Sequence, residues 1–170
     1  SFGVPEEGII KLDGNENPYG CSPRVNRALA SYSNFNIYPD DSQGKIRKQI
    51  SGYCGVDAWH IVATGGSNLL IDLILRLFLN RGDEVINLVP TFGIFKFSTM
   101  LCGGKIVEVP RDENFAVDVK AVKAAISNKT KVIFLVNPNN PTGTMTPKAD
   151  VLEILDTGLP VVVDEAYCEF

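Results

Sequence analysis

The sequence predicts an α/β fold, a three-layer αβα sandwich around a mostly parallel sheet. Strand patterns alternate with helix patterns from about residue 61 onwards, and the strand patterns are continuous apolar runs such as Val132–Val136. Such strands need cover on both faces, which parallel sheets obtain from helices on each side. The length of 170 residues suits one domain of ordinary size, or part of a larger one.

Two short helices are expected before the alternating region. Ser22 and Pro23 form an N-cap and first-turn signal for a helix that runs to about Tyr32. Residues 45–53 repeat the helical spacing of apolar positions.

The alternating region then supplies the sheet and its covering helices. The expected strands are 61–63, 84–89, 105–109, 131–136 and 160–163, and the expected helices are 68–80, 93–102, 118–127 and 147–156. The last expected strand is too apolar to lie at a solvent-exposed edge of the sheet, so we expect the sheet to be incomplete. We expect the chain to be the front part of a longer protein, with cover by another chain as the alternative.

Composition and charge exclude several classes of protein. Lysine and arginine total 16 against 20 for aspartate and glutamate, a net charge of −4, which disfavours a nucleic-acid-binding protein. The longest apolar run, around residues 69–79, contains Asp72 and Arg76 and is too short to cross a bilayer. We therefore expect neither nucleic acid nor membrane among the partners.

The four cysteines are far apart and lack the spacing of zinc ligands, so no metal site is predicted. In a chain this apolar we expect them to be small buried thiols rather than disulfides. Reduced thiols indicate a cytoplasmic location, with a plastid as a further possibility.

Ligands of open α/β sheets bind beyond the carboxyl ends of the strands, so the loops that follow the expected strands are candidate sites. Residues 64–68 join a strand to a helix, and two glycines there free backbone N–H groups to face an anion at the helix N-terminus. The spacing matches neither the usual dinucleotide motif nor the triphosphate motif. The alternative interpretation is a glycine turn with Ser67 as the helix cap.

Two more loops carry side chains suited to a flat ligand. Phe92 lies just past a strand, where its ring can stack on a ligand ring, although packing in the core is the commoner use of such a side chain. Residues 137–143 hold three asparagine amides in a proline-stiffened loop, and one amide can hold a phenolate or carbonyl oxygen. A structural turn made of favoured turn residues is the alternative.

The strongest signal is Asp164, which comes directly after the apolar run of residues 161–163. Burial of an unpaired carboxylate is costly, so Asp164 needs a cation or strong donors. A protonated ring nitrogen of a cofactor would serve, and Tyr167 is close enough in sequence to reach the same ligand. The alternative is an aspartate that caps the next helix.

Six segments together carry a resemblance to a known family. They are residues 11–20, 38–40, 66–67, 90–92, 137–143 and 164–167. In order and spacing they resemble the histidinol-phosphate aminotransferases, a family of fold-type I pyridoxal-phosphate enzymes, over nearly the whole chain. The resemblance implies that residues 36–170 are the first half of the cofactor-binding large domain. Residues 1–35 would be an N-terminal arm and part of the small domain.

The resemblance also implies pyridoxal 5'-phosphate as the cofactor. Asp164 would pair with the protonated pyridine nitrogen, which keeps the ring an electron sink. Asn140 and Tyr167 would hydrogen-bond the 3-oxygen of the ring, and Asp164 and Tyr167 are the implied catalytic residues. Phe92 would stack on the ring, at a position where family members usually carry tyrosine.

The remaining implied contacts concern phosphate and substrate. The backbone amides of Gly66, Ser67 and Asn68 would bind the cofactor phosphate. Tyr38 would reach a phosphate in the neighbouring subunit of a homodimer, and Asn17 would line the substrate pocket.

The Schiff-base lysine of the family lies in a serine-rich segment downstream of the motif at 164–167, and none of the ten lysines present matches that segment. We therefore expect this chain alone to be inactive. The implied reaction converts L-histidinol phosphate and 2-oxoglutarate to imidazole acetol phosphate and L-glutamate, in histidine biosynthesis. One alternative is an aminotransferase or decarboxylase for another phosphorylated or aromatic amino acid. Another is a non-catalytic binding or interaction fragment.

Overall fold

The computed structural model describes the chain except for residues 1–2, 4 and 6–7. The chain divides into two compact units, Ser1–Lys45 and Ile46–Phe170.

The described residues of the first unit contain one complete α-helix, α1 (Pro23–Ser31), and the start of α2 (Gly44–Cys54). Ser22 caps α1, since its hydroxyl accepts a hydrogen bond from the Arg24 amide at 3.3 Å. The predicted helix start is therefore confirmed. None of the residues of α1 is buried.

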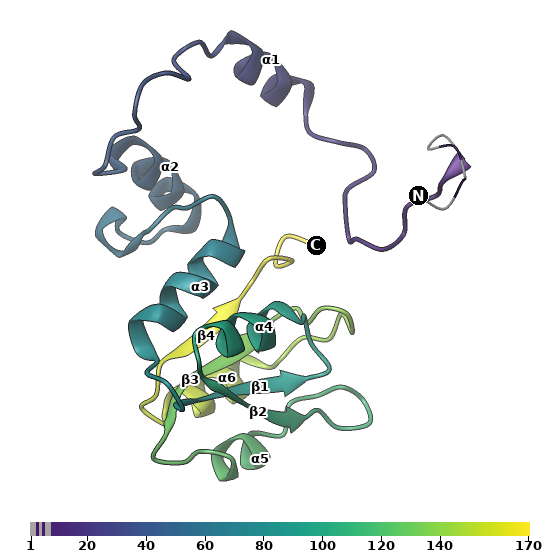
Figure 1. The fold of residues 1–170 in the computed structure, drawn as a ribbon, viewed down its shortest axis with the longest axis vertical. Coiled ribbons are helices and arrows are strands. Elements are labelled where there is room, and N and C mark those ends of the chain that lie inside the picture. Colours follow the sequence, from purple (N-terminus) through teal and green to yellow (C-terminus); the bar gives the residue numbers. More distant parts are fainter. Residues whose placement is uncertain (1–2, 4, 6–7) are drawn as a thin grey trace. The chain divides into compact units, whose positions relative to one another are not determined.

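The second unit is built on a four-stranded sheet in the order β2-β1-β3-β4 (Figure 1). All three strand pairs are parallel. The strands are β1 (Glu84–Val89), β2 (Lys105–Pro110), β3 (Thr130–Val136) and β4 (Val161–Asp164). The helices are η2 (Ala58–His60), α3 (Ser67–Phe78), α4 (Ile94–Leu101), α5 (Val119–Ala124) and α6 (Lys148–Leu155), together with the rest of α2.

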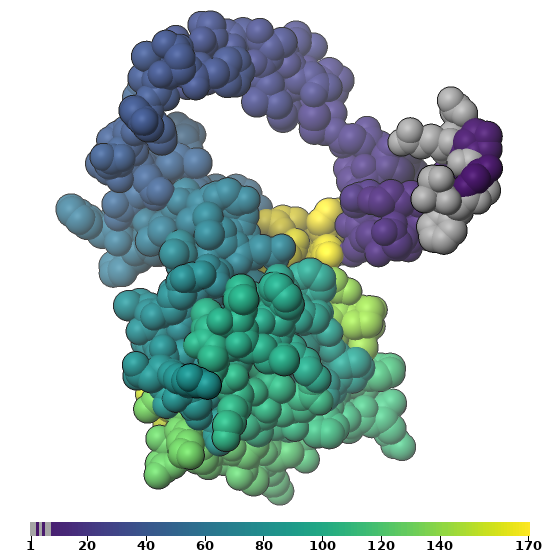
Figure 2. Space-filling model, in the orientation of Figure 1, coloured from purple at the N-terminus to yellow at the C-terminus, as the bar shows by residue number. Residues whose placement is uncertain are grey.

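Two apolar clusters, one on each face of the sheet, form the core. On one face, Ile71 and Leu75 of α3 and Phe95 of α4 pack against alternate residues of β1 and β3. On the other face, Val122 of α5 and Ile154 of α6 pack against the intervening residues. Side chains of a strand alternate between the faces, which explains why the central strands β1 and β3 carry apolar residues on both faces. The predicted three-layer α/β sandwich is confirmed, and Figure 2 shows the α3 and α4 layer from outside.

One predicted element is wrong. Residues 61–63 form no strand, because Ile61 follows η2 directly and its amide bonds back to the Ala58 carbonyl. An apolar triplet is too short to form a strand without a neighbour to pair with, and no strand of the described residues lies beside it. The segment is instead an extended link into α3, with Ile61 buried.

The burial predicted for the cysteines is also wrong. All four thiols are free, but Cys21, Cys54 and Cys168 are exposed and Cys102 is half-buried. Cys21 precedes α1, Cys54 is the last residue of α2 and Cys168 follows β4, and all three lie outside both apolar clusters. The helix expected at 118–127 is shorter than predicted, at Val119–Ala124, although its cap Asp118 does bond the amides of Lys120 and Ala121.

Candidate functional site

Three of the candidate loops meet at one edge of the sheet. β1, β3 and β4 are neighbours and parallel, so their carboxyl ends lie side by side. Phe92 follows β1, Asn140 follows β3, and Asp164 is the last residue of β4. The sheet therefore brings an aromatic ring, an amide and a carboxylate to a single edge, as the loop analysis predicted.

Phe92 is partly exposed, at 43%. Its ring lies edge-on to Phe95, with centroids 6.4 Å apart and an interplanar angle of 86°. Phe95 is fully buried and packs on Phe134 of β3 at 4.6 Å. The Phe92 ring thus contacts the core through Phe95 and keeps exposed surface that is available to a ligand.

Two adjacent asparagines of the loop after β3 are used in opposite ways. Asn139 is buried, and its amide bonds the loop after β1. Asn140 is half-buried, and its side chain makes no hydrogen bond to any described residue. An amide carries both donors and acceptors, so Asn140 is the one of the pair that is available to a ligand.

Asp164 is half-buried at the end of β4, where it pairs with Val136. One of its carboxylate oxygens accepts a hydrogen bond from the Ala166 amide at 3.0 Å, so the carboxylate does cap the turn that follows. No lysine, arginine or histidine of the described chain forms a salt bridge with it. Tyr167 lies three residues on, also half-buried, with its ring 6.4 Å from that of Phe170.

The start of α3 is the fourth candidate segment. Gly66 precedes the helix at a φ of +123°, a conformation that favours glycine, and no side chain caps the first turn. Ser67 is the first helical residue rather than the cap of the alternative interpretation. Gly66, Ser67 and Asn68 are exposed, so the N-terminal amides of this twelve-residue helix face outward toward solvent or an anion.

Two predicted site residues belong to the other unit. Tyr38 is almost fully exposed. The Asn17 side chain makes a local turn, in which it donates to the Gly20 carbonyl and accepts from the Tyr19 amide. The roles expected for Asn17 and Tyr38 stay predictions.

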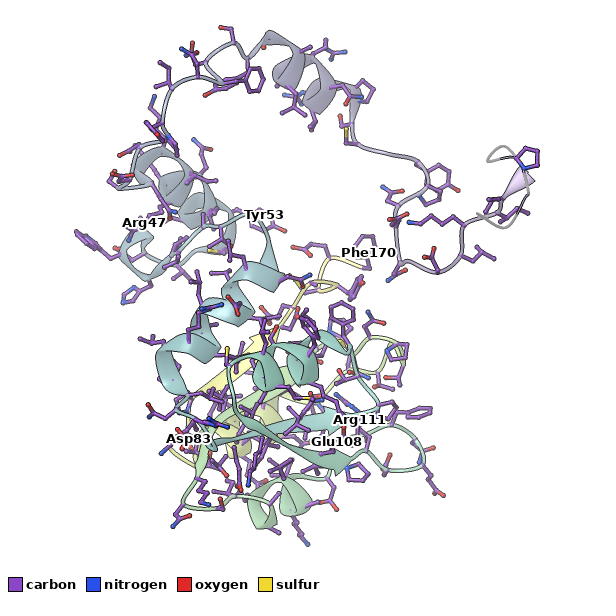
Figure 3. All side chains as sticks on the ribbon, viewed as in Figure 1. Arg47, Tyr53, Asp83, Glu108, Arg111 and Phe170 are labelled. Carbon is purple, nitrogen blue, oxygen red and sulfur yellow. The ribbon has the colours of Figure 1, made fainter. Side chains whose placement is uncertain are left out.

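A polar contact that the sequence did not indicate joins α2 to the segment after β4. The Tyr53 hydroxyl donates to the Glu169 carboxylate at 2.5 Å (Figure 3 labels Tyr53 and Phe170, the neighbour of Glu169). This bond raises the pKa of the Tyr53 hydroxyl and lowers the pKa of the Glu169 carboxyl. The two residues are 116 positions apart, a separation at which sequence spacing carries no signal.

The described residues contain no group of histidine, cysteine, aspartate and glutamate that could hold a metal ion. Among the same residues no helix is long and apolar enough to span a membrane.

Comparison with known proteins decides the family. Residues 7–170 match the model of the family "Aminotransferase class I and II". The chain belongs to this family. Curated relatives of this aminotransferase chain include the histidinol-phosphate aminotransferase of Dehalococcoides mccartyi, 54% identical over 95% of the chain and 45% of that protein. The chloroplastic histidinol-phosphate aminotransferase of Nicotiana tabacum is 39% identical over 99% of the chain and 41% of that protein.

Solved structures agree on the fold of the aminotransferase chain. The histidinol-phosphate aminotransferase of Sinorhizobium meliloti, in complex with pyridoxal-5'-phosphate, matches with a TM-score of 0.83 and 27% identity over 91% of the chain and 43% of that structure. The alanine aminotransferase of Pyrococcus furiosus matches with a TM-score of 0.72 and 29% identity over 83% of the chain and 39% of that structure. The chain thus spans less than half the length of the relatives it matches, and the resemblance seen in the sequence is confirmed.

Proposed function

We propose that residues 1–170 carry the cofactor-binding half of a pyridoxal-phosphate-dependent histidinol-phosphate aminotransferase. The observation that carries the proposal is the edge of the sheet where Phe92, Asn140 and Asp164 follow three adjacent strands. The curated relatives with this name, at 39–54% identity, support the choice of substrate class.

The residues at this edge fit pyridoxal phosphate. The cofactor combines a flat ring, a basic ring nitrogen, a ring oxygen and a phosphate group. The chain offers a match for each of these groups. Phe92 is a partly exposed aromatic ring for the flat ring, and Asp164 is a carboxylate without a cationic partner among the described residues for the ring nitrogen. Asn140 is an amide with free hydrogen-bonding groups for the ring oxygen, and the uncapped start of α3 suits the phosphate. Each ligand group therefore has a chemically matched residue on this chain.

Pyridoxal phosphate, when bound, supplies a conjugated ring that accepts the electron pair released as the α C–H bond of an amino acid breaks. We propose that the Asp164 carboxylate holds the proton on the pyridine nitrogen, since an anion favours the charged form of a nearby base. Asn140 and Tyr167 would bind the ring oxygen, and Phe92 would exclude water from one face of the ring. The amides of Gly66, Ser67 and Asn68 would bind the phosphate.

The other parts of the proposal concern the complete gene product. It would use L-histidinol phosphate and 2-oxoglutarate, act as a homodimer in which Tyr38 reaches the phosphate of the neighbouring subunit, and bind substrate through Asn17. We propose a cytoplasmic location, with a plastid as the further possibility, and the chloroplastic tobacco relative supports the plastid. Residues 1–35 would form the arm and part of the small domain, and residues 36–170 the first half of the large domain.

Borohydride trapping tests the cofactor chemistry. The complete gene product is loaded with pyridoxal phosphate, reduced with borohydride, digested and mapped. We expect a visible absorption band before reduction and one labelled lysine outside residues 1–170. A stoichiometric label on one of the ten lysines of this segment would show that the nucleophile lies within it.

Substrate comparison tests the specificity. The loss of the cofactor band is followed on addition of L-histidinol phosphate, of L-alanine and of an aromatic amino acid. We expect kcat/KM to be highest for L-histidinol phosphate. Equal or higher values for another amino acid would move the assignment to another aminotransferase of the family.

A further inference from the structure

Asn139 joins the two loops that carry Phe92 and Asn140. Its side-chain nitrogen donates to the Pro90 carbonyl at 3.1 Å and to the Thr142 hydroxyl at 2.7 Å. Its side-chain oxygen accepts from the Thr91 hydroxyl at 2.8 Å. The carbonyl of Pro90 can only accept, so the amide nitrogen must face it and the orientation of the amide is fixed.

The hydrogen-bonding groups of Asn139 are fully used inside the protein. The side chain is 2% exposed, and both amide hydrogens and the oxygen have partners. Its backbone is also held, since its amide bonds the Thr144 carbonyl at 2.9 Å and its carbonyl accepts from the Gly143 amide at 2.7 Å. Asn139 therefore has no group left for a ligand, and its side chain has one fixed position.

The partners of Asn139 lie immediately beside the two ligand-facing residues. Thr91 and Pro90 directly precede Phe92, and Asn139 directly precedes Asn140. The side-chain amide of Asn139 thus sets the distance between the Phe92 ring and the side-chain amide of Asn140. Two ligand-binding groups must be held to within a fraction of an ångström to act on the same ligand, and buried hydrogen bonds behind them provide that precision.

We propose that Asn139 is a positioning residue, which aligns Phe92 with Asn140 at the cofactor ring without touching the cofactor. The proposal rests on the proposed function above. In this proposal Asn139 acts through Asn140. This role distinguishes Asn139 from a residue that only stabilises the fold.

The first test is the pH midpoint of the visible absorption band of bound pyridoxal phosphate, measured in the complete gene product. An amide that donates to the ring oxygen favours its ionised form and lowers this midpoint. We expect Asn140→Ala to raise the midpoint, and Asn139→Ala to raise it in the same direction by a smaller amount. Because Asn139 acts through Asn140, the double variant should have the midpoint of Asn140→Ala alone.

Turnover gives a second readout. Misalignment of the two loops should lower kcat of Asn139→Ala by up to about a hundredfold with a smaller change in KM. Thr91→Val keeps the shape of its side chain and removes one of the three side-chain bonds of Asn139. We expect Thr91→Val to shift the midpoint and kcat in the same directions as Asn139→Ala, but by smaller amounts. This second variant keeps the proposal testable if Asn139→Ala does not fold.

Asn137→Ala is the matched control in the same loop. The Asn137 side chain accepts from the Thr146 amide at 2.8 Å and makes no side-chain bond to the loop after β1. Its replacement should lower the melting temperature and leave the midpoint unchanged. A cofactor-free readout is hydrogen exchange of the Gly143 amide, which donates to the Asn139 carbonyl at 2.7 Å and should exchange faster in Asn139→Ala and Thr91→Val but not in Asn137→Ala.

The outcomes separate the two proposals. A wild-type protein without a visible band on loading overturns the proposed function and this inference with it. A wild-type band whose midpoint is unchanged in Asn139→Ala and Thr91→Val overturns the inference alone. A double variant with a midpoint above that of Asn140→Ala would show that Asn139 does not act through Asn140, which also overturns it.

Discussion

The loops after β1 and β3 are joined to each other by buried side-chain bonds, whereas the segment after β4 is held mainly by bonds among its own residues. In the first region Asn139 ties the loops together and the Phe92 ring rests on the core through Phe95. In the second, Asp164 bonds the Ala166 amide, and the bond between Glu169 and Tyr53 is exposed. The comparison teaches that core contacts and buried bonds fix the loops that carry Phe92 and Asn140, whereas the turn after Asp164 depends on local and exposed polar contacts.

The largest expected effect comes from loss of the core support under Phe92. Phe95→Ala removes a fully buried ring that packs on Phe134, and should destabilise the fold by about 3–5 kcal/mol. Phe97→Ala is the matched control on the same helix, because Phe97 is 63% exposed. Urea denaturation of the complete gene product measures both. Equal losses would show that the loop after β1 does not rest on the core as described.

Asp164→Ala tests the role of the carboxylate at the end of β4. Without the carboxylate that we propose pairs with the pyridine nitrogen, turnover of the complete gene product should fall by about a hundredfold to a thousandfold, the scale for removal of one well-placed electrostatic group. The fold should change little, because Asp164 is only half-buried and bonds a local turn. Steady-state kinetics and a melting curve measure the two effects.

Glu165→Gln serves as the control for Asp164→Ala, since Glu165 is exposed and adjacent. It should retain near-normal turnover. A normal rate in Asp164→Ala would remove this residue from the proposed chemistry.

In both regions the sequence predicted the local features and missed the bonds between distant residues. The strands and the position of Phe92, Asn140 and Asp164 at their ends follow from local patterns, because parallel strands place their carboxyl ends together. The Asn139 network and the bond from Tyr53 to Glu169 join residues 48, 49 and 116 positions apart, and depend on which strands become neighbours. A triplet such as residues 61–63 could not be assigned for the same reason, since a strand is defined by its partner.

A smaller effect is expected from the exposed ring itself. Phe92→Ala removes a stacking surface worth about 0.5–1.5 kcal/mol, and should weaken binding of pyridoxal phosphate by about two- to tenfold. Phe92→Tyr keeps the ring and should bind the cofactor as the wild type does. A titration of the apo form of the complete gene product with pyridoxal phosphate measures the dissociation constants. Unchanged affinity in Phe92→Ala would contradict the stacking role.

The smallest effect concerns the contact that ties the segment after β4 to α2. The pKa of the Glu169 carboxyl is lowered by its bond from Tyr53, so this stabilisation is present above the ordinary carboxyl pKa of 4.5 and is lost as the pH falls through the lowered value. The pKa of the Tyr53 hydroxyl is raised, so the stabilisation is present below its ordinary value of 10.0 and is lost as the pH rises through the raised one. The bond therefore acts across the neutral range and disappears at both extremes.

Tyr53→Phe removes this bond alone. We expect the pKa of Glu169, followed by carboxyl NMR titration, to rise toward its ordinary value. Tyr32→Phe removes an exposed hydroxyl that bonds the Asn34 carbonyl, and should leave the Glu169 titration unchanged. The stability difference between wild type and Tyr53→Phe should be largest near neutral pH and vanish at either extreme, because the Glu169 carboxylate is protonated at low pH and the Tyr53 hydroxyl is ionised at high pH. A Glu169 pKa that does not move in Tyr53→Phe would mean that the segment after β4 is held by bonds among its own residues alone.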